Sequence, residues 1–75
     1  MKILSKEVKF NKTDSDRLYC IKDGETYVFT LYQLEWSIII HDQAQIENVV
    51  EWRECSQDFK SRMLSEMKKI IREFR

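Results

Sequence analysis

The chain is poor in residues that interrupt regular structure. Among its 75 residues it has one glycine, Gly24, and no proline. Because few breaks allow few tight turns, we expect long secondary-structure elements. A single glycine also cannot build a glycine-rich phosphate-binding loop, so nucleotide hydrolysis and dinucleotide binding are excluded as functions.

Residues that ligate metals or carry out catalysis are also scarce. The chain has two cysteines, Cys20 and Cys55, and one histidine, His41, and neither a Cys-x-x-Cys nor a His-x-x-x-His spacing occurs. Neighbouring side chains on a helix diverge by about 100°, so Asp42 is poorly placed to orient His41 as a general base. The sequence therefore predicts no catalytic residues, no metal site and no cofactor, and it favours a protein that is not an enzyme.

Long apolar runs are missing as well. No segment approaches the ~20 apolar residues of a membrane span, and residues 1–7 contain no apolar run of the kind found in a signal peptide. We therefore expect a cytoplasmic protein that does not bind membranes and whose two cysteines are reduced. A disulfide between them is the alternative for a secreted chain.

Charge is balanced in total but not along the chain. The 13 basic residues equal the 13 acidic ones in number. Residues 1–22 carry six basic against three acidic residues, residues 23–58 one against eight, and residues 59–75 six against two. In a chain short enough to form a single domain, 1–75, we expect these segments to neutralise each other within the fold or across a dimer.

The first half of the chain has the pattern of a β-meander. Alternating apolar residues predict a strand at 3–10, with a polar loop after it. Asp23-Gly24 predicts a two-residue hairpin between strands at 17–22 and 25–30, with Lys22 opposite Glu25. One face of this hairpin should point to the core, and it carries Leu18, Cys20, Tyr27 and Phe29. The other face is apolar enough to be covered or to bind a partner, and it carries Tyr19, Ile21 and Val28.

The second half predicts helices. Thr30 and Gln33 match a capping box and predict a helix at 31–40. Asp42 repeats the cap pattern, which predicts a kink near His41 and a second helix at 43–55. One continuous helix, or a fourth strand at 37–40, is the alternative.

The last helix is predicted at 57–74, capped by Ser56, because its apolar residues recur at spacings of three and four. The predicted fold class is therefore α+β. It consists of a three-stranded antiparallel meander followed by two or three helices packed on one face.

The candidate binding residues follow from this arrangement. On a helix at 31–40, Trp36 and Ile40 form an i, i+4 apolar pair opposite the core, and the same side continues with Glu47, Glu51 and Glu54. An exposed aromatic residue bordered by acidic residues is typical of a protein-binding hot spot. Burial of Trp36 in the core is the alternative, because a small fold has little apolar surface to spare.

These residues, together with Tyr19, Ile21 and Val28, predict a small non-enzymatic protein-binding module. Such a module would act as an inhibitor, adaptor or complex subunit, for instance a phage- or plasmid-borne inhibitor of a host machine. Its acidic residues would steer it toward a basic surface on another protein.

The alternative function is that of a small nucleic-acid-binding regulator. It would use Lys68, Arg72 and Arg75, which share one ridge of the last helix. A homodimer that pairs acidic with basic surfaces is compatible with either function.

Overall fold

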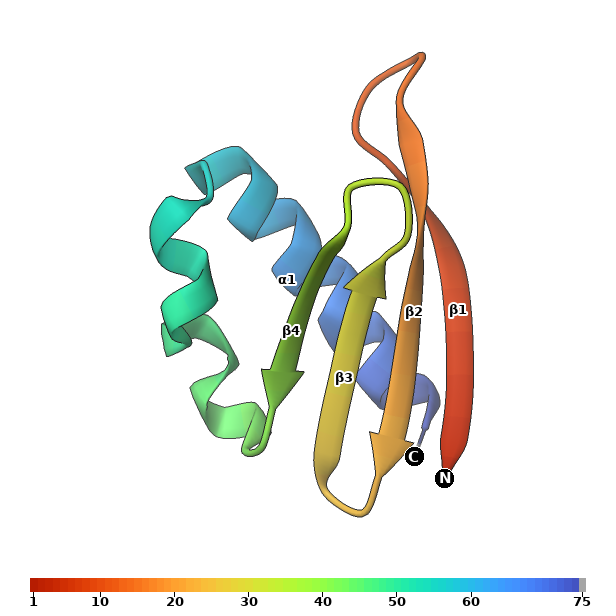
Figure 1. Ribbon diagram of the computed structural model, residues 1–75, viewed down its shortest axis with the longest axis vertical. Coiled ribbons are helices and arrows are strands. Elements are labelled where there is room, and N and C mark those ends of the chain that lie inside the picture. Colours follow the sequence, from red (N-terminus) through yellow and green to blue (C-terminus); the bar gives the residue numbers. More distant parts are fainter. Residues whose placement is uncertain (75) are drawn as a thin grey trace.

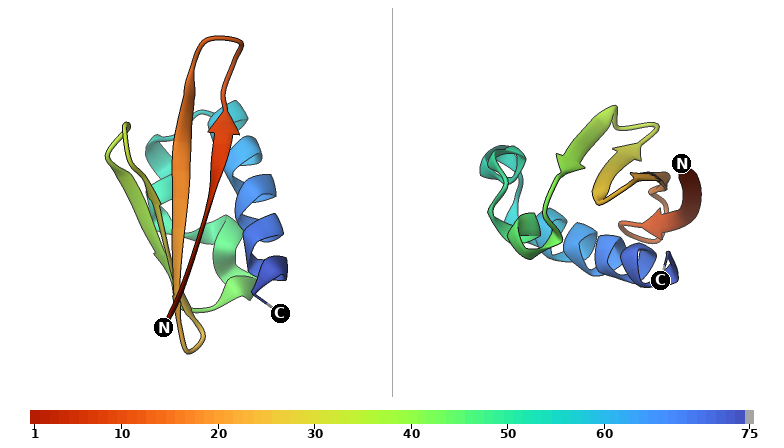
Figure 2. Two further views of the ribbon diagram at one scale, coloured as in Figure 1. Left: turned by 90° about the vertical axis from the view of Figure 1, so that its right-hand side faces the viewer. Right: turned by 90° about the horizontal axis from the view of Figure 1, so that it is seen from below.

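The computed structural model describes residues 1–74 and consists of a sheet with a helix across one face (Figures 1 and 2). The antiparallel sheet has the order β1-β2-β3-β4, with strands β1 (Lys2–Lys9), β2 (Ser15–Asp23), β3 (Thr26–Leu31) and β4 (Trp36–Ile40). Two short 3-10 helices, η1 (Gln43–Asn48) and η2 (Val50–Glu54), follow beside β4 and lead to α1 (Gln57–Glu73). The α+β class is confirmed, with four strands rather than three. No helix within residues 1–74 is both long and apolar enough to span a membrane.

The hairpin between β2 and β3 forms where it was predicted, but its register differs by two residues. Asp23 pairs with Thr26, so the central residues of the turn are Gly24 and Glu25 rather than Asp23 and Gly24. Gly24 has a φ of 62°, as the first central residue of a type II′ turn requires. A shift of two residues keeps every side chain on its predicted face. The predicted inner residues are accordingly all buried, namely Leu18, Cys20, Tyr27 and Phe29.

The predicted helix at 31–40 is wrong, and the alternative of a fourth strand is correct. Residues 32–35 form a turn after which β4 pairs with β3, with Trp36 opposite Leu31. The capping box does not form because the Gln33 N–H instead donates to the buried carboxylate of Asp16, at 3.0 Å from each oxygen. The Leu34 N–H donates to Asp16 Oδ2 at 3.0 Å. A side chain from β2 therefore fixes this turn.

The turn between β3 and β4 also contains a strained residue. Glu35 has a φ of 52°, in the left-handed region that side chains with a Cβ disfavour. We expect Glu35→Gly to raise the free energy of unfolding by about 0.5–1 kcal/mol relative to Glu35→Ala, because glycine removes the strain. Urea unfolding of the two variants measures the difference. A glycine variant no more stable than the alanine variant would contradict a strained turn.

The predicted helix at 43–55 is present as two 3-10 segments, separated at Val49, whose backbone is extended. Asp42 caps the first segment as predicted, with its Oδ1 accepting from the Ala44 N–H at 2.9 Å. The indole N–H of the buried Trp52 donates to the carbonyl of Ile46 at 2.7 Å. This bond joins η2 to η1, and it gives the buried indole its polar partner.

Helix α1 matches its prediction closely. Ser56 caps it, with its hydroxyl accepting from the Phe59 N–H at 3.1 Å. Its buried residues are Met63, Met67, Ile70 and Ile71. They pack on the inner face of the sheet, so the core is a single layer between the sheet and α1 (Figure 2).

Candidate protein-binding surface

The outer face of the sheet, turned away from α1, is covered by no other element of residues 1–74 (Figure 2). Strand alternation decides which side chains lie there, because successive residues point to opposite faces. Leu18 of β2, Phe29 of β3 and Ile38 of β4 point into the core. In each strand, the residues immediately before and after these therefore point outward. The outer face therefore collects side chains from all four strands.

Four of these side chains form one line across the sheet. Ile3 pairs with Ile21, Ile21 with Val28, and Val28 with Ile39. We call these four residues the outer apolar row. Ile3 is 59% exposed and Ile39 is 50% exposed, while the two central members are half-buried. Tyr19, in the next row, is 39% exposed.

The sequence placed three of these residues on the outer face and missed two. Tyr19, Ile21 and Val28 lie where the hairpin pattern predicted them. Ile3 was not predicted as a binding residue because the other residues on that face of β1 are polar. The alternation of the strand nevertheless puts Ile3 on the outer face. Ile39 was missed because the predicted helix assigned it to the core.

Trp36 and Ile40 do not form the predicted exposed pair. On a strand, residues 36, 38 and 40 share a face, and this face is the inner one. Ile40 is fully buried. Trp36 is partly buried in an aromatic cluster, with its ring centroid 5.4 Å from that of Trp52 and 5.5 Å from that of Phe59. The alternative, in which Trp36 belongs to the core, describes its surroundings better.

One residue of the predicted acidic side, Glu47, forms an ion pair with helix α1. Glu47 accepts from Lys68 Nζ at 2.8 Å, and the hydrogen bond and charge of Lys68 lower the pKa of Glu47. Glu51 and Glu54 are exposed on η2. The structure thus brings together one residue from each of two predicted binding surfaces, and they neutralise each other.

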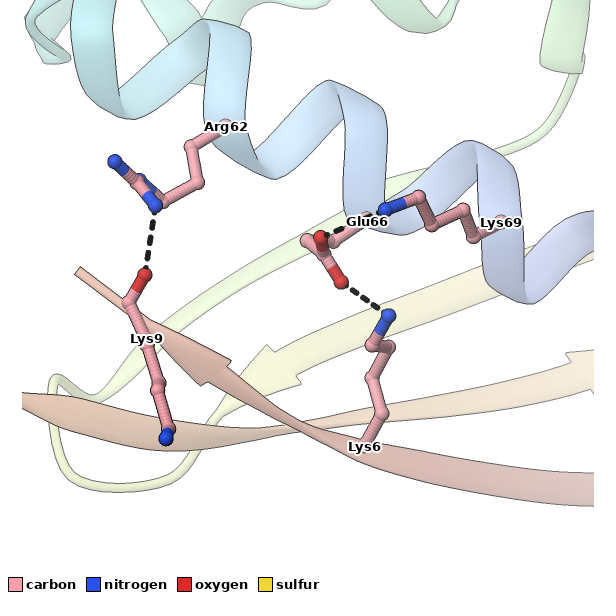
Figure 3. Close-up of polar contacts among 5 residues, drawn as sticks. All are labelled: Lys6, Lys9, Arg62, Glu66 and Lys69. Atoms are coloured by element: carbon pink, nitrogen blue, oxygen red, sulfur yellow. Dashed lines mark hydrogen bonds and ion pairs between the residues drawn. The ribbon is translucent and has the colours of Figure 1, made fainter.

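Other charges on α1 hold it to strand β1 (Figure 3). Glu66 forms ion pairs with Lys6 of β1 and with Lys69, the latter at 3.4 Å. Arg62 Nη1 donates to the carbonyl of Lys9 at 2.8 Å. These contacts join the two basic segments, 1–22 and 59–75, whereas the Lys68–Glu47 ion pair joins a basic segment to the acidic segment 23–58.

Of the residues predicted for nucleic-acid binding, Lys68 and Arg72 lie one turn apart on α1. Lys68 lies in the ion pair with Glu47. Arg72 is exposed, and Arg75 lies outside the described residues. Nucleic-acid binding stays a prediction that no observation here strengthens.

The side chains that could act in catalysis or bind a metal, those of Cys20 and His41 among them, lie in surroundings that give no sign of a reactive site. Burial raises the pKa of the Cys20 thiol to about 12, which leaves it protonated and unreactive at neutral pH. His41 Nδ1 lies 3.5 Å from the Thr26 hydroxyl. Within residues 1–74, no three His, Cys, Asp or Glu side chains are grouped as metal ligands would be.

Comparisons with protein-family models, with curated proteins and with solved structures found no match to this chain. The outer face of the sheet presents a line of branched aliphatic side chains that crosses all four strands, and the two end members, Ile3 and Ile39, are half or more exposed.

Proposed function

We propose that this chain is a small non-enzymatic protein-binding module, an inhibitor, adaptor or complex subunit, and that it binds through the outer face of its sheet. The observation that carries the proposal is the outer apolar row. Isoleucine and valine on the solvent side of a sheet contribute nothing to the interior of an isolated molecule. Completely burying one fully exposed side chain of this kind is worth about 1.5–3 kcal/mol. A partner that covers the row gains a fraction of this from each member, and most from Ile3 and Ile39, which are the most exposed.

The surroundings of the row resemble the border of an interface. The next row along the strands contains Ser5, Tyr19, Thr30 and Ser37, and the row on the other side contains Asp23 and Thr26. An apolar centre within a polar rim is the usual organisation of protein interfaces. Tyr19 suits this position because its ring adds contact area while its hydroxyl stays able to hydrogen-bond.

The test is capture of partners from the native host with the wild-type protein and with Ile39→Lys as baits. Ile39 is half exposed, so a lysine there can reach solvent without entering the core. A partner retained by the wild type should be lost with Ile39→Lys, because the partner would have to bury an unpaired charge.

The matched control is Val50→Lys, which places the same charge at an exposed aliphatic residue of η2, away from the sheet. It should retain the same partner as the wild type. Equal retention by Ile39→Lys and the wild type would move the binding surface elsewhere, and loss with both variants would indicate a general effect of charge.

A further inference from the structure

We infer that the outer face binds a second copy of this chain, with the two sheets packed face to face about a two-fold axis that runs along the outer apolar row. This inference rests on the proposed function, because it names the partner of the same surface. The symmetry and the charges of this face support the inference, and its area sets the expected strength of the dimer.

The symmetry follows from the register. The outer apolar row crosses all four strands at one level. A two-fold axis along this line places each member of the row against its own copy, and the strands of the two sheets then run in opposite directions. Two sheets packed face to face lie about 10 Å apart, a distance that the aliphatic side chains of the two facing surfaces fill. The row therefore buries itself without any shift of register.

The same axis brings opposite charges together. On one side of the row, β2 carries Tyr19 and then Arg17, and on the other side it carries Asp23. Rotation about the row exchanges these two sides, so Tyr19 of each copy lies over Asp23 of the other. Arg17 of each copy then lies toward Glu25, in the exposed turn beyond Asp23.

Arg17 is available for such a contact. Its Nε donates to the hydroxyl of Ser5 at 3.2 Å, and it forms no ion pair with any carboxylate of residues 1–74. An axis parallel to the strands would instead place Arg17 over the turn at 32–35 and Glu7 over Glu35, which repel each other. The charges therefore favour the axis along the row.

The area sets the strength of the dimer. Four strands about 4.8 Å apart and about six residues long present roughly 400 Å² per copy, or about 800 Å² for the pair. This is below the roughly 1,200–2,000 Å² of stable specific interfaces and in the range of weak, transient ones, so we expect a reversible dimer with a Kd of roughly 10–100 μM. An obligate dimer would bury more surface.

Sedimentation equilibrium of the wild-type protein from about 5 to about 500 μM, a range that brackets this Kd, tests the inference. We expect a monomer at the lowest concentration and a dimer at the highest. Ile39→Lys should weaken the dimer at least about tenfold, and Val50→Lys should leave it unchanged. Thermal unfolding of each variant verifies that it is folded.

A charge exchange provides a second test that does not depend on the aliphatic row. Arg17→Glu alone should weaken the dimer about fivefold or more, because each copy then repels the acidic turn of the other. Adding Glu25→Arg to Arg17→Glu should restore it, because the pair is rebuilt with reversed signs.

The outcomes separate this inference from the proposed function. A wild type that stays monomeric throughout the range overturns the inference, as does a dimer insensitive to Ile39→Lys. A charge exchange that fails to restore the dimer overturns the axis along the row. If the wild type is monomeric while Ile39→Lys still loses a captured host protein, the proposed function stands and the partner is a different protein.

Discussion

Replacing Asp16 with alanine is expected to lower the free energy of unfolding by about 3 kcal/mol. Its carboxylate is 4% exposed and accepts from the backbone N–H groups of Arg17, Gln33 and Leu34. Alanine leaves these donors without an acceptor and frees the turn between β3 and β4. A domain of this size has a total stability of only about 3–5 kcal/mol, so the variant should be close to unfolding at room temperature.

Urea unfolding measures this loss, with Glu54→Ala as the control. Glu54 is exposed on η2, so its replacement should change the stability by no more than about 0.5 kcal/mol. Asp16→Asn should be intermediate, because its amide retains one acceptor oxygen but turns an N–H toward backbone donors. If Asp16→Ala lost no more than the control, the turn would have to be held by other contacts.

The ionisation of Asp16 adds a dependence on pH. Burial acts to raise the pKa of Asp16, but the backbone N–H donors of Gln33, Leu34 and Arg17 outweigh it and hold the pKa below its usual range. Since the pKa is lower in the folded state, the ionised carboxylate stabilises the fold fully at neutral pH. This stabilisation is lost as the pH falls through the folded-state pKa. The advantage of the wild type over Asp16→Asn should therefore be constant near pH 7 and shrink below about pH 4.

Trp52→Ala is expected to cost about 3–5 kcal/mol of stability, a loss comparable to the whole stability of the domain. The indole of Trp52 is 5% exposed, packs against Trp36 and bonds the carbonyl of Ile46. Alanine removes both the ring and the bond, so η2 loses its contact with Trp36 of β4 and its hydrogen bond to η1. Near-ultraviolet circular dichroism, which reports the packing of the two indoles, and urea unfolding measure the effect.

Trp52→Phe separates the two contributions. Phenylalanine retains the aromatic contact with Trp36 but cannot donate to Ile46, so it should cost about 1–2 kcal/mol. A loss below about 1 kcal/mol for Trp52→Ala would contradict this prediction. It would mean that contacts other than those of the indole hold residues 43–54.

The parts of the fold with strong local signals could be predicted from the sequence. The stripe of α1, the cap at Ser56 and the position of the β2–β3 hairpin, though not its register, depend on residues within a few positions of each other. The region 31–40 could not, because its local pattern favours a helix while its structure is decided at a distance. The N–H of Gln33 is bound by Asp16, and Ile38 pairs with Phe29, and neither partner lies within the segment.

The candidate surface could be predicted only where it depends on the hairpin. Tyr19, Ile21 and Val28 belong to the hairpin and were placed correctly on its outer face. The outer apolar row as a whole was not visible, because it consists of single residues from four strands aligned by their register. Trp36 was predicted on the exposed side because a helix at 31–40 turns it away from the core. On a strand it shares the inner face with Ile38 and Ile40.

The order of the sheet has a consequence for how the chain folds. Each strand pairs with the strand next to it in sequence, so the sheet requires only small loops to close and should form on the order of milliseconds. Helix α1 must instead return from the C-terminal end to reach β1, as its ion pair with Lys6 shows, so it should dock last. Until it docks, both faces of the sheet are open to other nascent chains. The lysines on the edge strand, Lys2, Lys6 and Lys9, then oppose the addition of a further strand.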